Sequence, residues 1–129
     1  MSVQFNHTIV WSSDRTASAE FFAEIYGLPA PEDLYHFKVV KVANGVSIDF
    51  ADREGAIAPQ HYALLVGEDE FTGIMERIEA RGMQFWADPG RSKPGEINRN
   101  DGGRGVYFEG PDGHFFEALT VPFGGWESD

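Results

Sequence analysis

Apolar and polar positions divide the first half of the chain into short segments of two kinds. Residues 5–11 (FNHTIVW) form a short apolar run that is typical of a strand. Residues 13–27 then carry Ala17, Phe21 and Ile25 at helical spacing, with Phe22 and Tyr26 beside them, and end on a glycine. Two further apolar runs, 37–42 and 46–52, flank an Asn-Gly pair that favours a tight hairpin. This half therefore predicts a strand, a helix and a hairpin.

The second half repeats that order. A strand is predicted at 61–66, followed by an amphipathic helix in 68–82 and by apolar runs at 83–88, 105–110 and 114–121. The helix has acidic residues in its first turn and a basic residue in its last, as the helix dipole favours. Its expected buried face consists of Phe71, Ile74, Met75 and Ile78. Each half therefore reads as strand, helix and then a group of strands.

The repeat extends to four polar residues. His7 and His61 each open the first strand of a half. Asp49 lies four residues after the turn glycine Gly45, and Glu117 lies four residues after Gly113. Because side chains alternate across a strand, each of the four shares a face with apolar neighbours. If the two halves pair their sheets, these four side chains converge in one largely apolar cavity.

Glu117 is the most unusual of the four, because it lies inside the apolar run FFEAL. An ionised carboxylate is costly there unless a cation or hydrogen-bond donors compensate it. A divalent metal shared with imidazoles is one such cation, and these ligands suit iron, manganese, nickel, cobalt or zinc. We therefore predict a metal site of His7, His61, Glu117 and Asp49. Each residue alone also has a structural explanation: a hydrogen-bonded strand histidine, or a solvated edge carboxylate for Asp49.

Several other residues are candidates for the same site. Tyr107 lies across the predicted hairpin from Glu117, where its hydroxyl either reaches the reacting group or belongs to the core. Trp11 shares the His7 face and is assigned to substrate binding. His114 alternates away from Glu117 and is interpreted as structural.

The segment 87–105 is rich in glycine and proline, and loops of this length usually have a function or lack order. It holds four of the ten basic residues in an acidic chain. We predict that Arg99 and Arg104 contact an anionic substrate; the alternative is a solvated mobile loop.

Composition narrows the choice of partners. The net charge of −11 repels phosphate backbones and anionic lipid surfaces, which argues against nucleic-acid and membrane partners. The chain has no cysteine, no signal segment and no membrane-length apolar run, so a cytoplasmic protein with a small-molecule substrate is expected. Its 129 residues suit one domain, residues 1–129, with modules at about 3–53 and about 60–121.

The segments NHTIV, QHYALLV and GRGVYFEGPDGHFFEAL together resemble the vicinal oxygen chelate superfamily, which includes glyoxalase I, extradiol dioxygenases, fosfomycin-resistance transferases and bleomycin-resistance proteins. The resemblance runs from about residue 3 to 121 and is most specific in the last segment. It implies an α+β fold, in which two β-α-β-β-β modules form an open, barrel-like mixed sheet around a central cavity. The segment GLPAPEDLY departs from the pattern, because it leaves little room for a regular second strand.

Carried over by position, the resemblance implies metal ligation by His7, His61 and Glu117. Asp49 stands where glyoxalase-like members place a fourth ligand, usually a glutamate, and Tyr107 matches a pocket tyrosine of the fosfomycin group. It also implies a homodimer.

Three functions remain open. The first is a glyoxalase-type lyase or isomerase in which Glu117 or Asp49 moves a proton. The second is a ring-cleaving type dioxygenase that uses His7, His61 and Glu117. The third is a metal-free binding protein that confers drug resistance. We expect the first, because it uses all four polar positions, whereas fold alone does not choose among them.

Overall fold

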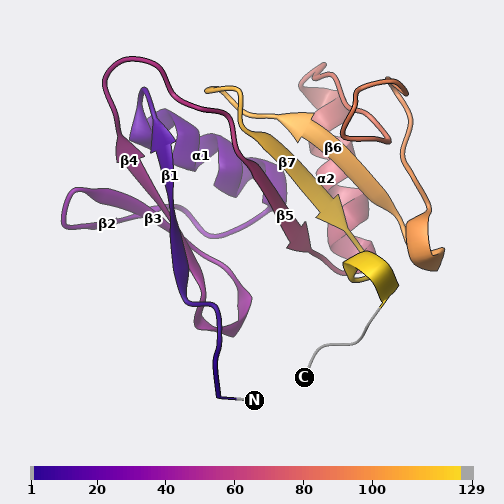
Figure 1. Ribbon diagram of the computed structural model, residues 1–129, viewed down its shortest axis with the longest axis horizontal. Helices are drawn as coiled ribbons and strands as arrows, with labels where there is room; N and C mark the ends of the chain where they lie inside the picture. Colours follow the sequence, from indigo (N-terminus) through magenta and orange to yellow (C-terminus); the bar gives the residue numbers. More distant parts are fainter. Residues whose placement is uncertain (1, 126–129) are drawn as a thin grey trace. The chain divides into compact units, whose positions relative to one another are not determined.

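The computed structural model describes residues 2–125, which form an α+β fold (Figure 1). The chain divides into two compact units, Met1–Ala58 and Pro59–Asp129, and each is described by itself. Within the described residues, neither helix is long and apolar enough to cross a membrane.

Unit one is a four-stranded mixed sheet with one helix. Its sheet has the order β1-β4-β3-β2, with β1 and β4 parallel and the other neighbours antiparallel. The elements are β1 (His7–Ser12), α1 (Arg15–Tyr26), β2 (Glu32–Leu34), β3 (Phe37–Lys41) and β4 (Ser47–Asp52). The second strand has only three residues, in agreement with the small space that the prolines at 29 and 31 leave for it.

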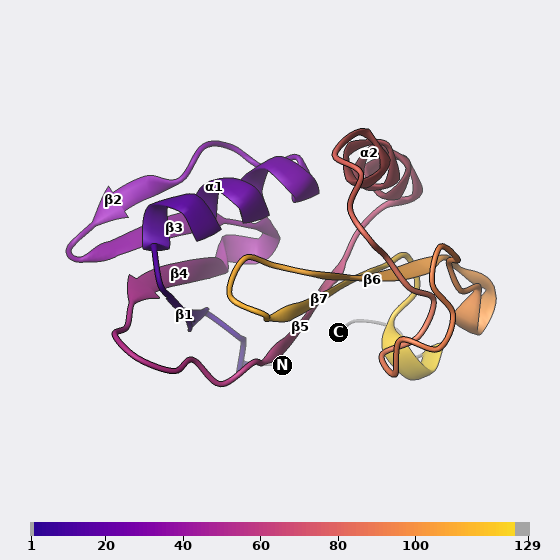
Figure 2. The ribbon, with the colours of Figure 1, turned by 90° about the horizontal axis from the view of Figure 1, so that it is seen from above.

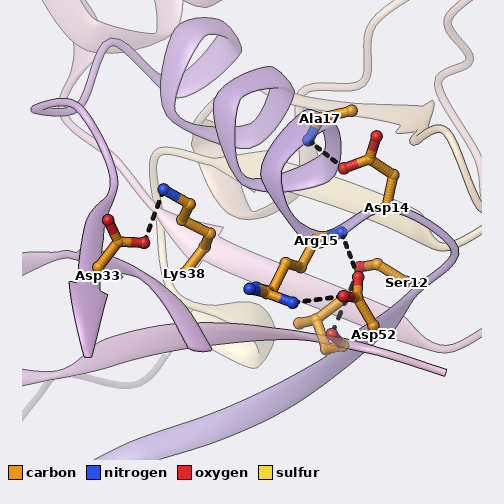
Figure 3. Close-up of polar contacts among 8 residues, drawn as sticks. Ser12, Asp14, Arg15, Ala17, Asp33, Lys38 and Asp52 are labelled. Carbon is orange, nitrogen blue, oxygen red and sulfur yellow. Dashed lines mark hydrogen bonds and ion pairs between the residues drawn. The ribbon is translucent and has the colours of Figure 1, made fainter. Parts of the chain in front are cut away.

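The turns of unit one follow the sequence signals. Asn44 and Gly45 both have positive φ, 65° and 72°, which is the backbone of a tight hairpin turn between β3 and β4. Asp14 caps α1, since its Oδ1 accepts a hydrogen bond from the Ala17 N–H at 3.1 Å (Figure 3). The same close-up shows Arg15 paired with Asp52 at the end of β4, so one ion pair ties the start of the helix to the sheet.

The buried face of α1 differs from the predicted stripe. Phe22, Ile25 and Tyr26 are buried as expected, but Ala17 is exposed and Phe21 is half-buried. The small residues Ser18 and Ala19 are buried in their place, which lets the helix backbone approach the sheet closely. The spacing of apolar residues thus located the helix but misjudged its rotation.

Unit two is a three-stranded sheet with one helix. Its order is β5-β7-β6, in which β5 and β7 are parallel and β6 and β7 antiparallel. The elements are β5 (His61–Leu65), α2 (Glu68–Ala80), β6 (Gly105–Glu109) and β7 (Phe115–Leu119). The run at 83–88 forms no regular strand: Trp86 makes only isolated bridges, to Tyr107 and Pro94. The turn that begins at Asp88 and Pro89 ends that pairing, because proline has no N–H for a ladder.

In both units one sheet face is apolar and the other carries polar groups. In unit one, Ile48 and Phe50 point toward α1, and the Phe50 ring lies 5.5 Å from the ring of Phe22. In unit two, buried Phe108 and Phe116 stack with ring centroids 5.7 Å apart on one face of the sheet, and α2 runs alongside this sheet (Figure 2). The predicted α+β class is confirmed; among residues 2–125 the strands form two separate sheets and do not close into one barrel.

Replacing Phe50 by alanine is expected to lower the free energy of unfolding by about 3–5 kcal/mol, because its loss leaves a cavity against α1. Phe50 is 1% exposed, whereas the control Leu34 in β2 is 52% exposed. Leu34→Ala is expected to change stability by only about 0.5 kcal/mol. Urea unfolding followed by circular dichroism measures both. Equal losses in the two variants would place the core elsewhere.

Candidate functional site

Glu117 lies at the centre of one face of the unit-two sheet. This face, which is opposite to the one that carries Phe108 and Phe116, is called the open face below. Its strand β7 is the middle strand, and in the ladder Glu117 pairs with Ala63 of β5 and Tyr107 of β6. Only 10% of its side chain is exposed. The sheet therefore presents one nearly buried carboxylate between two neighbouring strands, and this carboxylate needs polar partners.

His61 is the first of these partners. Its Nε2 lies 3.0 Å from Oε1 of Glu117, although the two residues are 56 positions apart in sequence. The parallel pairing of β5 and β7 brings them together. His61 pairs with Phe115, which lies two residues before Glu117 and on the same face of the sheet. The imidazole is 46% exposed, so one side of the pair is open to further groups.

Tyr107 is the second partner. Burial raises the pKa of Tyr107 to about 12, and the negative charge of Glu117 and a hydrogen bond to it act in the same direction. The phenol therefore stays protonated at neutral pH and donates its hydrogen to the Glu117 carboxylate. This geometry suits a donor that orients Glu117.

The atoms of this pair fit a metal ion. Metal bonds to imidazole nitrogen and carboxylate oxygen are about 2.0–2.2 Å long, so two ligands at a right angle lie roughly 3 Å apart. The His61 Nε2 to Glu117 Oε1 separation of 3.0 Å matches that spacing as well as a hydrogen bond. Within each unit, the described side chains bring no three His, Asp or Glu residues together. Unit two thus brings together two groups of the kind that bind metals, and metal ligation by this pair stays a prediction.

The other two predicted ligands lie in unit one. Because His7 pairs with Ser47 and Ile9 with Asp49, His7 and Asp49 share the sheet face opposite α1. His7 Nδ1 lies 2.7 Å from Asn6 Oδ1, so this nitrogen donates and Nε2 stays free of a proton in the neutral ring. Asp49 is buried and accepts a hydrogen bond from Ser47 Oγ at 2.8 Å. Their metal ligation stays a prediction.

The three residues assigned to substrate binding have different surroundings. The Arg104 Nε donates to Glu68 Oε1 at 2.8 Å, and its Nη2 donates to the Glu68 carbonyl at 2.9 Å, so this guanidinium is engaged with the start of α2. Arg99 is exposed, and its charge helps to lower the pKa of Glu68, after hydrogen bonds from Thr120 and Arg104. Trp11 lies on the His7 face, with the Arg53 guanidinium 5.6 Å from its ring.

A small cavity adjoins Glu117 within unit two. Its volume is about 20 Å³, which is room for about one water molecule. Glu117 and Tyr107 line it from the sheet, and Arg104 and Asn98 line it from the loop before β6. The described structure thus gives Glu117 a polar neighbourhood on this side as well.

Two further residues border this face: Phe115, which strand alternation predicts, and Arg91, whose place sequence reasoning missed. The Phe115 ring stacks on Tyr107, with centroids 5.5 Å apart, and the Arg91 guanidinium lies 4.6 Å above the Phe115 ring. Strand alternation places Phe115 with Glu117, but only the folded loop shows which of its basic residues reaches the ring. His114 is buried, and its Nδ1 accepts a hydrogen bond from the Gln60 N–H at 3.0 Å, which fits the expected structural role.

Comparison with known proteins gives three informative relatives. The solved structure of Oxidase ChaP-H1 is 57% identical with a TM-score of 0.94, and the match covers 96% of this chain and 100% of that chain. Oxidase ChaP-H2 is 55% identical with a TM-score of 0.91, over 95% of this chain and 96% of that chain. Glutathione transferase FosA of Serratia marcescens is 26% identical over 123 residues, which is 91% of this chain and 80% of the relative.

A family model extends over most of the chain. The model is described as the Glyoxalase/Bleomycin resistance protein/Dioxygenase superfamily, and it matches residues 4–118. This range contains all four predicted ligands together with Tyr107 and Arg91. The chain therefore belongs to the Glyoxalase/Bleomycin resistance protein/Dioxygenase superfamily.

Proposed function

We propose that this protein is a metal-dependent oxidase of a small molecule, with His61 and Glu117 as two of the metal ligands. The observation that carries the proposal is the 3.0 Å approach of His61 Nε2 to Glu117 Oε1 on the open face of the sheet. Support for oxidation comes from the relative named Oxidase ChaP-H1, which is 57% identical over nearly the whole of both chains.

The remaining ligand of the proposed set is His7, which the sequence repeat indicates. Its Nδ1 is engaged by Asn6, which leaves Nε2 as the nitrogen for a metal, and a hydrogen bond to the other ring nitrogen commonly orients metal-bound histidines. Asp49 is left out of the set, because its carboxylate already accepts the Ser47 hydroxyl and is one methylene shorter than glutamate.

Two imidazoles and one carboxylate leave coordination positions open, as in the facial triads of non-haem iron oxygenases. A bound redox-active metal would stabilise negative charge on substrate oxygens and exchange electrons with dioxygen.

The protein's own groups prepare that site. Tyr107 donates a hydrogen bond to Glu117 and so holds the carboxylate on the open face of the sheet. The rings of Phe115 and Tyr107 stack beside His61, which limits the water that reaches Glu117 from that side. The open side of His61 is where a small molecule would approach.

A glyoxalase-type lyase or isomerase is the second candidate. A specific observation favours it: Asp49 is buried on the same face as His7, as a fourth ligand requires. The oxidase is preferred, since the relatives so named are more than 50% identical and cover the chain more fully. A metal-free binding protein is the third outcome of the tests below.

The first prediction concerns metal content. Protein purified without chelators or an affinity tag should contain iron or manganese near one per chain, and His61→Ala and His7→Ala should each lose most of it, because each removes a nitrogen ligand. His36→Ala is the matched control, since His36 is exposed in the turn between β2 and β3. Mass spectrometry of the metals measures this.

The identity of the metal separates the candidates. Nickel, cobalt or zinc in place of iron or manganese would favour the lyase or isomerase. Absence of any metal, even after reconstitution, would leave the binding protein ahead.

The second prediction concerns open coordination positions. Anaerobic protein loaded with ferrous iron should bind nitric oxide and show the EPR signal of a high-spin ferrous nitrosyl, because nitric oxide occupies the position that dioxygen would use. Glu117→Gln should weaken iron binding and reduce that signal, since a carboxylate ligand is replaced by a neutral amide. A full signal in Glu117→Gln would remove this residue from the metal shell.

The third prediction concerns Tyr107. Tyr107→Phe should keep the fold but weaken metal affinity by about 10–100-fold, since it removes the donor that orients Glu117. The nitrosyl EPR line shape of the iron-loaded variant should also change, which a purely structural role for Tyr107 would not cause. Tyr62→Phe is the control, because Tyr62 lies on the opposite face of the sheet, where its ring stacks on Phe116. Identical behaviour of the two variants would assign Tyr107 to the core alone.

A further inference from the structure

Arg91 occupies an unusual place on the open face of unit two. Its guanidinium carbon lies 4.6 Å from the Phe115 ring centre and 4.8 Å from the Trp86 ring centre, so one cation contacts two aromatic rings. Its Nη2 donates to Glu109 Oε1 at 3.0 Å. The side chain is nevertheless 42% exposed, so several of its donors can be reached from solvent.

The loop is built to hold Arg91 there. The Asp88 carboxylate accepts hydrogen bonds from the Ser92 N–H, the Ser92 hydroxyl and the Lys93 N–H, at 2.6 to 3.0 Å. These contacts close a tight turn in which Arg91 has a φ of 59°, a conformation that is costly for a residue with a Cβ. A strained backbone of this kind persists only where surrounding contacts hold it in place, and such residues are common at functional sites.

The same face connects Arg91 to the proposed metal ligands. Phe115 lies two residues before Glu117 on β7, and two residues of a strand span about 7 Å. The rings of Tyr107 and His61, which both contact Glu117, have centroids 5.5 and 6.3 Å from the Phe115 ring. The rings of Phe115, Tyr107 and His61 thus form an aromatic strip, which the Arg91 guanidinium contacts at Phe115 and which ends beside Glu117 at His61 and Tyr107.

From this arrangement we propose that Arg91 is a specificity-determining residue that binds a carboxylate of the substrate, at the far end of the strip from the reacting oxygens. The proposal rests on the proposed function for the chemistry at Glu117, but the anion contact at Arg91 stands on its own geometry. The substrate class is a small, flat molecule with an anionic group several bonds from the oxygens that are oxidised. Substrate contacts by Arg99 and Arg104 stay predictions, and Arg91 is added to them as a loop residue that recognises charge.

Glu109 gives an internal indication of the ligand chemistry. Its carboxylate is bound by one nitrogen of Arg91, at the edge of the strand that also carries Tyr107. A substrate carboxylate would use the remaining donors or displace Glu109, because arginine binds carboxylates in a two-pronged geometry. Glu109 thus competes with other carboxylates for Arg91 and lowers the affinity of Arg91 for them.

Benzoate and benzamide test this directly, since they differ in charge and hardly in shape. Titration calorimetry is done on protein stripped of metal with a chelator, so that neither probe can bind a metal. Wild type should bind benzoate at least about tenfold more tightly than benzamide, because a hydrogen bond to a charged group is stronger than one between neutral groups. Arg91→Met should abolish that preference, and Arg91→Lys should restore part of it.

Two further variants sharpen the test. Lys93→Met removes a neighbouring exposed cation of the same loop and should keep the preference for benzoate. Glu109→Gln should tighten benzoate binding, because it removes the competing carboxylate, and this gain cannot arise from a misfolded loop.

Equal binding of the two probes by wild type, or a preference that survives in Arg91→Met, would overturn the proposal. Metal-binding assays on the same variants keep the two ideas separate. An Arg91-dependent preference in a protein that binds no iron would refute the metal proposal alone.

Discussion

The buried carboxylate of Glu117 is the constraint on which the rest of the candidate site depends. It lies on the middle strand of an apolar sheet, where a charge without partners would destabilise the fold. The structure supplies His61 from one neighbouring strand and Tyr107 from the other. Both partners are imposed by the ladder register, so a shift of one residue in either pairing would turn them away from Glu117.

The two units use one design with different polar partners. In each, a parallel pair of strands places a histidine from the first strand on the same face as an acid from the last. In unit two the acid contacts the histidine, whereas in unit one Asp49 contacts Ser47 and His7 contacts Asn6. The repeat therefore preserves the position of the acid but not its hydrogen-bond partner. For this reason Glu117 and Asp49 are assigned different roles.

The loop before β6 shows how a long connection acquires a definite geometry. Its basic residues look alike in the sequence, yet the fold separates them: Arg104 anchors the start of α2, and Arg91 lies over two aromatic rings. The turn organised by Asp88 makes that difference, since its hydrogen bonds fix the backbone on both sides of Arg91. The loop thus places one cation over the aromatic rings of the Glu117 face and uses another to clamp the start of α2.

Strand alternation, turn residues and the internal repeat were enough to predict both helices, the Asn44 hairpin and the shared face of Phe115 and Glu117, whereas the α+β class followed from the family resemblance. These features depend on local geometry, in which the side-chain period determines the face. Tertiary structure alone decided the rotation of α1, the absence of a regular strand at 83–88 and the contacts of Arg91 and Arg104. Each of these depends on packing between segments far apart in the chain, where small residues, a proline turn or an aromatic ring selects one arrangement among several that the local pattern allows.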